Sequence, residues 1–388
     1  MTAPCVERVT RAFEERFGRP ALVVRSPGRV NLIGEHTDYN LGFVLPAAVD
    51  RAIWLALSPR ADARCRFFAV DLSERYEASL DALEKSEVHW ANYLLGILSE
   101  LTGEGHRLGG LDCAFGGDIP IGSGLSSSAA LECGFAFAVN ELFALGYERE
   151  KLARLGQRSE NRFVGVNCGI MDQFASLLGR DGRLIRLDCR DLSYEYVPFE
   201  RRDLRLVLCD TQIRRALATS EYNVRRAQCE AGVTTIARHR PEVHSLRDAT
   251  LEMLEAHRGE LGPVVFARCA YVVRENQRVV EACAALGRGD FLGFGRLMNL
   301  SHAGLSGEYQ VSCAELDALA SAAQAVPGVL GSRMMGAGFG GCTINLVEEG
   351  ALPLFEGRME ETFRQKLGKE PVLHVCRLTG GTEIARKS

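Results

Sequence analysis

A short segment rich in glycine and serine, followed at once by an apolar helix, is the strongest constraint in this sequence. Residues 122–130 read GSGLSSSAA, and from Ala129 to Leu145 almost every residue is small or apolar. A helix that is hydrophobic on all sides is a buried helix, and Gly146 is placed to end it. Its first turn has unpaired N–H groups and the positive end of the helix dipole, where phosphate binds readily. The segment therefore favours nucleotide binding slightly over a plain serine-rich helix cap.

Two familiar nucleotide motifs are excluded. No lysine follows Gly124, so the loop is not a Walker A phosphate loop. Residues 336–341 (GAGFGG) match G-x-G-x-x-G, but a β-branched segment follows them where dinucleotide-binding folds have a helix. We therefore reject dinucleotide binding. The cluster is either a tight turn between a helix and a strand or a second wall packed against a bound ligand.

Composition narrows the class of protein further. A length of 388 residues suggests two or three domains. Lys plus Arg (46) nearly balance Asp plus Glu (50), which argues against a surface built for nucleic acid or anionic lipid. No apolar run reaches the roughly 18–20 residues of a membrane helix. Thirteen cysteines without a C-x-x-C pair are typical of buried thiols in a reducing compartment. We expect a cytoplasmic protein with no nucleic-acid and no membrane partner.

Apolar spacing and turn residues divide the chain into two α+β halves. Charged residues around Pro198 mark a candidate boundary, so we expect one domain over residues 1–195 and a second over residues 196–388. The first strand is expected to end at Ser26-Pro27-Gly28. We expect helices at 6–17, 129–145, 148–163, 220–238, 264–286, 291–305 and 313–325, and strands at 21–24, 44–57, 65–70, 182–189, 204–209 and 342–347.

Charged side chains gather directly after the first strand. Residues 29–40 (RVNLIGEHTDYN) contain Arg29, Glu35, His36 and Asp38. Such a run is usually a solvated loop. The spacing argues against zinc, because His36 and Asp38 are two residues apart and have no second histidine nearby. The third interpretation is a sugar site, since several fixed donors and acceptors are what polyol hydroxyls need.

Two further carboxylates lie twelve residues apart. Asp172 is flanked by apolar Ile170-Met171 and Phe174, where it would be partly desolvated. It is either a helix-capping residue or a catalytic acid in a dry pocket. Glu160 alone is typical of an exposed helix carboxylate.

Together these segments resemble the galactokinase family of the GHMP small-molecule kinase superfamily. The resemblance implies a two-domain α+β fold, with mixed β-sheets packed with helices and an active site in the cleft between the domains. The first domain would carry the sugar signature and the ATP phosphate loop, and the second a helical layer, a sheet and a glycine-rich third motif. The similar segments are residues 27–46 (the sugar signature), 117–132 (the phosphate loop), 165–179 (the catalytic segment), 220–230 and 331–346.

The same resemblance implies an activity. The enzyme would transfer phosphate from ATP to the C1 hydroxyl of α-D-galactose, with Mg²⁺ as cofactor, and give galactose 1-phosphate and ADP, the opening step of galactose catabolism. Its small-molecule substrates would be galactose and ATP, and the protein would be a monomer. Ala337 stands where many relatives have glycine, a change that should leave the turn intact.

The resemblance also assigns roles to individual residues. Asp172 resembles the catalytic aspartate next to the sugar C1 hydroxyl, and Arg29 the cation beside it. Ser128 and Glu160 resemble the Mg²⁺ ligands, although Ser126 and Ser127 are adjacent alternatives. The sugar would be held by Glu35, His36, Asp38, Gly169, Asp172 and Tyr222; the ATP phosphates by Gly122, Ser123, Gly124, Leu125, Ser126, Ser127, Ser128 and Ala129; and the adenine by Trp90 and Tyr93.

Three alternatives stay open. A GHMP kinase for another sugar, such as N-acetylgalactosamine or arabinose, would share every phosphate motif. Some fungal relatives sense galactose and ATP without turnover, but they lack two residues of the serine-rich loop, which is uninterrupted here. A binding module unrelated to kinases would leave Asp172 and Arg29 without a role.

Overall fold

The computed structural model describes residues 4–120, 124–213 and 218–387. Its first half is built on a six-stranded sheet in the order β13-β1-β3-β6-β4-β5. All neighbours are antiparallel except β4 and β6, which are parallel. The strands are β1 (Leu22–Asn31), β3 (Pro46–Pro59), β4 (Arg64–Ala69), β5 (Glu74–Ser79), β6 (Leu111–Gly117) and β13 (Glu383–Lys387).

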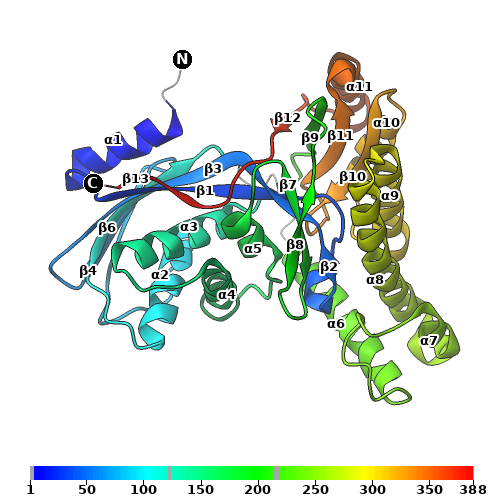
Figure 1. The fold of residues 1–388 in the computed structure, drawn as a ribbon, viewed down its shortest axis with the longest axis horizontal. Coiled ribbons are helices and arrows are strands. Elements are labelled where there is room, and N and C mark those ends of the chain that lie inside the picture. The colour runs from blue at the N-terminus through cyan, green and yellow to red at the C-terminus, as the bar shows by residue number, and fades with distance from the viewer. Residues whose placement is uncertain (1–3, 121–123, 214–217, 388) are drawn as a thin grey trace.

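Helices cover both faces of this sheet (Figure 1). Helix α1 (Cys5–Phe17) packs Val9 and Phe13 against β1, β3 and β6 on one face, and Gly18 ends it as the spacing predicts. On the other face α3 (Ser127–Leu142) packs against β1 and β3. It is buried on nearly every side, so its predicted burial is confirmed, although it ends before Gly146. Around α3 lie α2 (His89–Gly103), α4 (Arg149–Ser159), a π-helical turn (Glu160–Val164) and α5 (Met171–Leu178).

Strand β1 is longer than the sequence predicts. Ser26-Pro27-Gly28 does not end it; instead the register against β3 shifts between Pro27 and Arg29, and the strand continues. The reason lies in the loop that precedes α3. The Arg29 N–H donates to the Leu125 carbonyl at 3.1 Å, and a Cβ on Gly28 would lie 2.7 Å from that same oxygen. The glycine thus allows the loop to lie directly on the strand.

The second half is a four-stranded antiparallel sheet with helices, in the order β10-β11-β9-β12. The glycine cluster at 336–341 joins β10 to β11, so the predicted turn between a helix and a strand is wrong: both neighbours are strands. The strands are β9 (Leu204–Asp210), β10 (Val329–Met335), β11 (Cys342–Glu348) and β12 (Leu373–Cys376), and the helices are α6 (Ala218–Ala237), α7 (Leu251–Ala256), α8 (Arg258–Gly287), α9 (Phe291–Gly304), α10 (Ala314–Gln324) and α11 (Leu352–Thr362).

A small third sheet and the C-terminal strand connect the two halves. The sheet has the order β2-β7-β8, with β2 (Phe43–Val44), β7 (Arg183–Asp188) and β8 (Tyr194–Pro198), and α8 packs against β2 and β8. After β12 the chain returns to the first sheet, where β13 pairs with β1 (Figure 1). The expected α+β class is confirmed, while the division at residues 195 and 196 stays a prediction.

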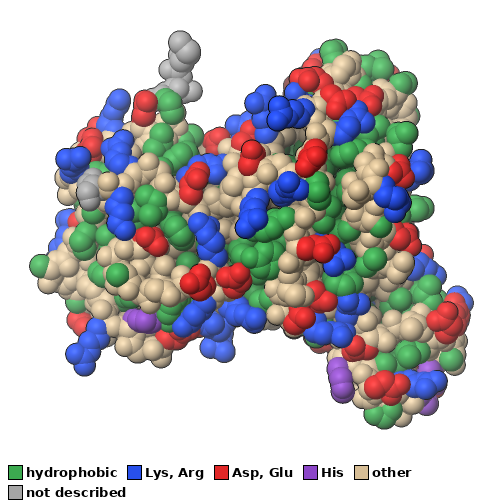
Figure 2. All heavy atoms as spheres, viewed as in Figure 1, with side chains coloured by type: hydrophobic (Ala, Val, Ile, Leu, Met, Phe, Trp, Pro, Cys, Tyr) green, Lys and Arg blue, Asp and Glu red, His purple; other side chains and the backbone are tan. Residues whose placement is uncertain are grey.

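The surface agrees with the balanced charge of the sequence. Figure 2 shows basic and acidic side chains intermixed over the visible face. All thirteen cysteines are free thiols, and eleven of them are buried. Among the described residues, no helix has the length and apolar character needed to cross a bilayer.

Candidate active site

A cavity of about 210 Å³ lies between elements of the two halves. Its walls come from the loop after β1, the turn and helix around α5, the start of α6 and the glycine cluster after β10. Arg29 and Glu160 also line it. All six residues predicted to bind the sugar meet here: Glu35, His36, Asp38, Gly169, Asp172 and Tyr222.

Asp172 is held by a cation and a hydroxyl. It lies in the first turn of α5, and both of its oxygens accept from Arg29, from Nε at 2.7 Å and from the terminal nitrogen Nη2 at 2.8 Å. Ser126, at the start of α3, donates its hydroxyl to Asp172 Oδ2 at 2.5 Å. Burial lowers the pKa of Arg29, but the neighbouring Asp172 carboxylate outweighs that effect and holds the pKa above its usual value.

Arg29 also ties this carboxylate to the serine-rich loop. Its second terminal nitrogen, Nη1, donates to the Gly124 carbonyl, and its backbone N–H donates to that of Leu125. A single buried guanidinium therefore contacts both the loop that precedes α3 and the carboxylate at the cavity. The two motifs that lie nearly fifty residues apart in sequence become one structural unit.

Glu35 is positioned from the opposite half of the molecule. Its Oε1 accepts from Arg333 of β10 at 2.6 Å and from the Gly336 N–H at 2.8 Å. The Arg333 side chain is 0% exposed and also donates to the carbonyls of Asn31 and Leu32. Sequence reasoning missed Arg333, because nothing local distinguishes it from a surface arginine.

His36 is neutral and held in a chain of aromatic hydroxyls. Its Nδ1 lies 2.8 Å from the Tyr39 hydroxyl, which lies 2.8 Å from that of Tyr309. Burial, reinforced by the cations of Arg225 and Arg333, lowers the pKa of His36 to about 3. A neutral imidazole can donate from one nitrogen and accept at the other.

Asp38 packs directly against the backbone at Gly169. A Cβ at Gly169 would lie 1.8 Å from Asp38 Oδ2, so only glycine leaves room for the carboxylate there. Burial and the nearby Asp172 carboxylate raise the pKa of Asp38 to about 7. The structure thus joins the charged cluster after β1 to the catalytic segment.

Glu160 lies among neutral donors and a second carboxyl group. Gln173 donates its amide to Glu160 Oε2 at 2.8 Å, and the Cys168 thiol lies 3.4 Å from the same oxygen. Ser128 and Glu132 also hydrogen bond to it. Burial and the Asp172 charge raise the pKa of Glu160 to about 7. The prediction that Glu160 resembles an exposed helix carboxylate when read alone is wrong, since it is buried in the π-helical turn after α4.

Glu132 was not singled out in the sequence, yet it completes this group. It is fully buried on α3, and burial together with Glu160 raises its pKa well above the usual value. The sequence contained a signal for it, because Glu132 is the one charged residue in the small and apolar run of residues 129–139. Two adjacent buried carboxyl groups beside a serine hydroxyl are an oxygen donor set of the kind that Mg²⁺ prefers. The residues present therefore fit a Mg²⁺ ion.

The predicted nucleotide residues are only partly placed. Gly122 and Ser123 lie outside the described residues. Gly124 and Leu125 contact Arg29. Ser126 precedes α3 in a left-handed conformation with φ 55°, and its side chain makes no capping hydrogen bond to the helix. Ala129 is buried in the first turn of α3 beside Ser127 and Ser128.

Trp90 and Tyr93 lie on α2, outside the walls of the sugar cavity. The Trp90 ring N–H donates to Glu74 at 2.6 Å, and the Tyr93 hydroxyl lies 3.4 Å from His89. Burial, together with the charges of Glu160 and Glu132, raises the pKa of Tyr93. The adenine contacts stay a prediction.

Comparisons with known proteins define the class. The model "GHMP kinases N terminal domain" matches residues 92–180, and "GHMP kinases C terminal" matches residues 280–365. The mevalonate kinase of Methanococcus jannaschii has the same fold, with a TM-score of 0.65 at 17% identity over 93% of this chain and 99% of that chain. The chain therefore has the fold of a GHMP kinase and matches the models of both GHMP kinase domains.

More specific matches narrow the family. The model "Galactokinase galactose-binding signature" matches residues 11–59. A galactokinase of Roseiflexus sp. is 45% identical over 95% of this chain and 94% of its own, and one of Chloroflexus aurantiacus is 41% identical over 97% of both. The crystal structure of Lactococcus lactis galactokinase complexed with galactose has a TM-score of 0.92 at 37% identity, covering 97% of this chain and 99% of that chain. The chain belongs to the galactokinase family, the ATP-dependent sugar kinases of this class.

Proposed function

We propose that this enzyme transfers the γ-phosphoryl group of ATP to the C1 hydroxyl of α-D-galactose, giving galactose 1-phosphate and ADP. The observation that carries the proposal is the position of Asp172. It lines the cavity that contains the predicted sugar residues, and through Arg29 and Ser126 it contacts the loop at the N-terminus of α3. From this position the Asp172 carboxylate would contact both the sugar and the transferred phosphate.

Asp172 would act as the base. Phosphoryl transfer proceeds through a loose transition state, so the protein mainly aligns the two substrates and neutralises charge. Asp172 would accept the proton of the C1 hydroxyl, and Arg29 would stabilise the oxygen as negative charge develops on it. The Ser126 hydroxyl would keep the carboxylate turned toward the boundary between the two substrates.

The sugar would be selected by donors and acceptors fixed in position. Glu35, anchored by Arg333, and Asp38, packed on Gly169, would accept hydrogen bonds from sugar hydroxyls. His36, Tyr222 and the Gly169 backbone would complete the pocket. An analogue without a matching hydroxyl would leave buried polar groups unpaired, which discriminates strongly.

Mg²⁺ would be held by Glu160 and one of the loop serines, with Ser128 the favoured candidate because it hydrogen bonds to Glu160. When bound, the ion supplies charge neutralisation to the ATP phosphates. The unpaired N–H groups of the first turn of α3 and residues 122–129 would hold the phosphates. Trp90 and Tyr93 would line the adenine site. A monomer in the cytoplasm is the expected form of the enzyme.

A coupled ADP-release assay tests the substrate. Galactose, N-acetylgalactosamine, arabinose and glucose are compared at equal concentration with ATP and Mg²⁺. The proposal expects the highest kcat/KM for galactose. A preference for another of these sugars would assign the enzyme to that sugar instead. Binding of galactose and ATP without ADP release would make it a sensor.

A further inference from the structure

A second group of metal-binding side chains lies far along the chain from the cavity residues. His239 follows the end of α6, His257 lies between α7 and α8, and Glu260 is in the first turn of α8. One ligand atom from each lies within 4.8 Å of the others. Within the described residues this is the one cluster of three or more such side chains with that spacing. The projection that α6 and α7 form is at the lower right of Figure 1.

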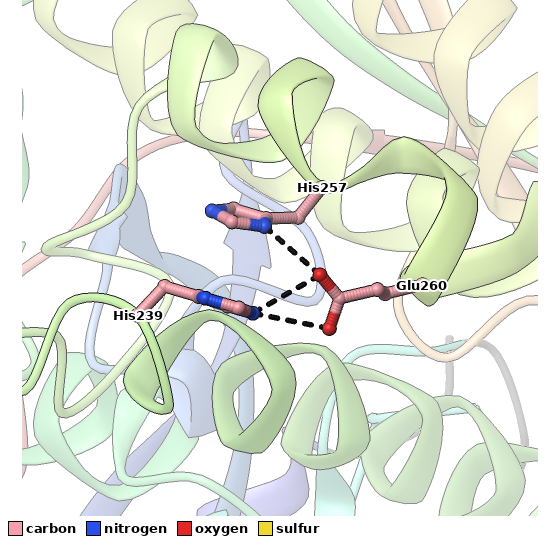
Figure 3. Close-up of side chains that lie close together, drawn as sticks. All are labelled: His239, His257 and Glu260. Carbon is pink, nitrogen blue, oxygen red and sulfur yellow. Dashed lines mark hydrogen bonds and ion pairs between the residues drawn. The ribbon is translucent and has the colours of Figure 1, made fainter.

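The Glu260 carboxylate lies beside the two stacked imidazoles and contacts both of them (Figure 3). His239 Nε2 is 3.0 Å from each Glu260 oxygen, and His257 Nδ1 is 3.2 Å from Oε1. These separations are close to those of neighbouring ligands around one tetrahedral ion with bonds of about 2.0–2.1 Å. The two carboxylate–imidazole separations therefore already suit one small cation, and the two ring nitrogens lie within 4.8 Å of each other.

The chemistry of the three ligand atoms indicates which cation they would bind. Two imidazole nitrogens and one carboxylate are the protein ligands of His₂Glu zinc sites, which leave the fourth position to water. Imidazole suits Zn²⁺, Ni²⁺ and Cu²⁺, whereas Mg²⁺ prefers oxygen ligands. We propose that His239, His257 and Glu260 bind one zinc-class divalent cation, with water as its fourth ligand.

One ring must turn when the cation binds. The two rings are stacked, with centroids 4.0 Å apart and planes 15° apart, and a metal lies in the plane of each imidazole that binds it. Both side chains have room to rotate, since 41% of the His239 and 20% of the His257 side chain is exposed. Without metal, Glu260 hydrogen bonds to both rings, and the cation replaces those contacts with bonds to the same three atoms.

The surrounding charges permit binding. Arg258, the neighbour of His257, is paired with Glu255 rather than with the cluster. Acidic and basic side chains occur together on this projection (Figure 2).

Binding would connect two parts of the chain. The ion would join the end of α6 to the turn between α7 and α8, closing the loop of residues 240–256. The other end of α6 carries Tyr222, which lines the sugar cavity. The cation is thus expected to stabilise the projection that α6 and α7 form. Because α6 also carries Tyr222, this would support one wall of the cavity.

Cobalt absorption tests the site, because Co²⁺ occupies zinc sites and has visible bands that report tetrahedral geometry. The full chain without an affinity tag is stripped with chelator and titrated with Co²⁺ in excess Mg²⁺, and then with Zn²⁺. We expect one tetrahedral Co²⁺ per chain, displaced by one Zn²⁺, and a rise in Tm with Zn²⁺. His239→Ala and His257→Ala should each weaken binding by more than about tenfold, and Glu260→Gln by about tenfold.

His244→Ala is the matched control, because His244 is an exposed histidine of the same loop that does not belong to the cluster. Its variant should bind Co²⁺ as the unchanged protein does. The proposal is wrong if no tetrahedral Co²⁺ forms, or if it persists in both His239→Ala and His257→Ala. Sulfur-to-cobalt charge-transfer absorption would place the metal on cysteine instead.

Discussion

Two carboxylates of the same cavity, Asp172 and Glu160, have opposite surroundings. Asp172 accepts two hydrogen bonds from the guanidinium of Arg29, at 2.7 and 2.8 Å, and a third from Ser126. Glu160 accepts from the neutral amide of Gln173 and lies beside a second carboxyl group, Glu132. Within the described residues, no hydrogen bond or ion pair joins Glu160 to a lysine or arginine.

The difference indicates two separate tasks. A carboxylate that is hydrogen bonded to an arginine of the same chain is stabilised as an anion by charge-assisted hydrogen bonds. An anionic carboxylate can accept a proton, as a base must. A buried carboxyl group without such a cation, whose pKa is raised to about 7, is only partly ionised at neutral pH until a cation binds beside it. The protein thus supplies the cation for Asp172 and leaves that of Glu160 to the solution, where Mg²⁺ is the proposed partner.

The largest expected effect comes from Asp172→Asn. The amide cannot accept the C1 proton, so kcat should fall by about 10²–10⁴-fold. Galactose binding, measured by calorimetry, should remain detectable because the other pocket residues are unchanged. Asp203→Asn, which alters an exposed carboxylate paired with Arg201, is the control and should retain normal turnover. Near-normal turnover of Asp172→Asn would show that another group is the base.

Glu160→Gln tests the other half of the comparison. Replacing the carboxylate by a neutral amide should weaken Mg²⁺ binding by about 10–100-fold. The Mg²⁺ dependence of ADP release measures this, and saturating Mg²⁺ should recover part of the activity. An unchanged Mg²⁺ requirement would remove Glu160 from the metal site.

The pH dependence of Mg²⁺ binding should follow Glu160. Because the pKa of Glu160 is raised to about 7 before metal binds, its ionised fraction grows as the pH rises through 7. Mg²⁺ affinity should increase by about tenfold from pH 6 to pH 8 and then level off. The metal-free protein should lose stability from about pH 4 to 7, since the raised pKa stabilises the folded state only at lower pH. Binding that is independent of pH in this range would contradict the assignment.

Glu132→Gln should give the smallest effect. It removes the carboxyl group whose hydrogen bond lowers the pKa of Glu160 but leaves the length of the side chain. The midpoint of the pH dependence should therefore move up, by about half a pH unit or less. Titration of Mg²⁺ at several pH values measures the shift. A midpoint that stays in place would mean that Glu132 does not influence Glu160.

Sequence patterns predicted the elements whose formation depends on residues close together in the chain. The apolar spacing of residues 6–17 predicts α1 to within a residue, and the run of small residues predicts the buried α3. Strand β1 was predicted too short, because the close approach of Leu125 that explains Gly28 is a contact with a distant loop. Helix α5 was missed because eight residues carry too little periodic signal.

The candidate site likewise contains residues that sequence motifs indicated and contacts that they did not. The motif resemblance predicted six residues that would bind the sugar, and all six line one cavity. It did not indicate that Arg333 anchors Glu35 or that Glu132 lies against Glu160. Each of these pairings joins residues far apart in sequence, so only the folded chain reveals them.

A crystal structure with galactose, Mg²⁺ and a non-hydrolysable ATP analogue tests the central claim most directly. The account predicts an Asp172 oxygen about 2.6–3.2 Å from the galactose C1 hydroxyl, with the triphosphate at the N-terminus of α3 and its terminal phosphate facing that hydroxyl. A sugar bound out of reach of Asp172, or a triphosphate bound away from the serine loop, would contradict it.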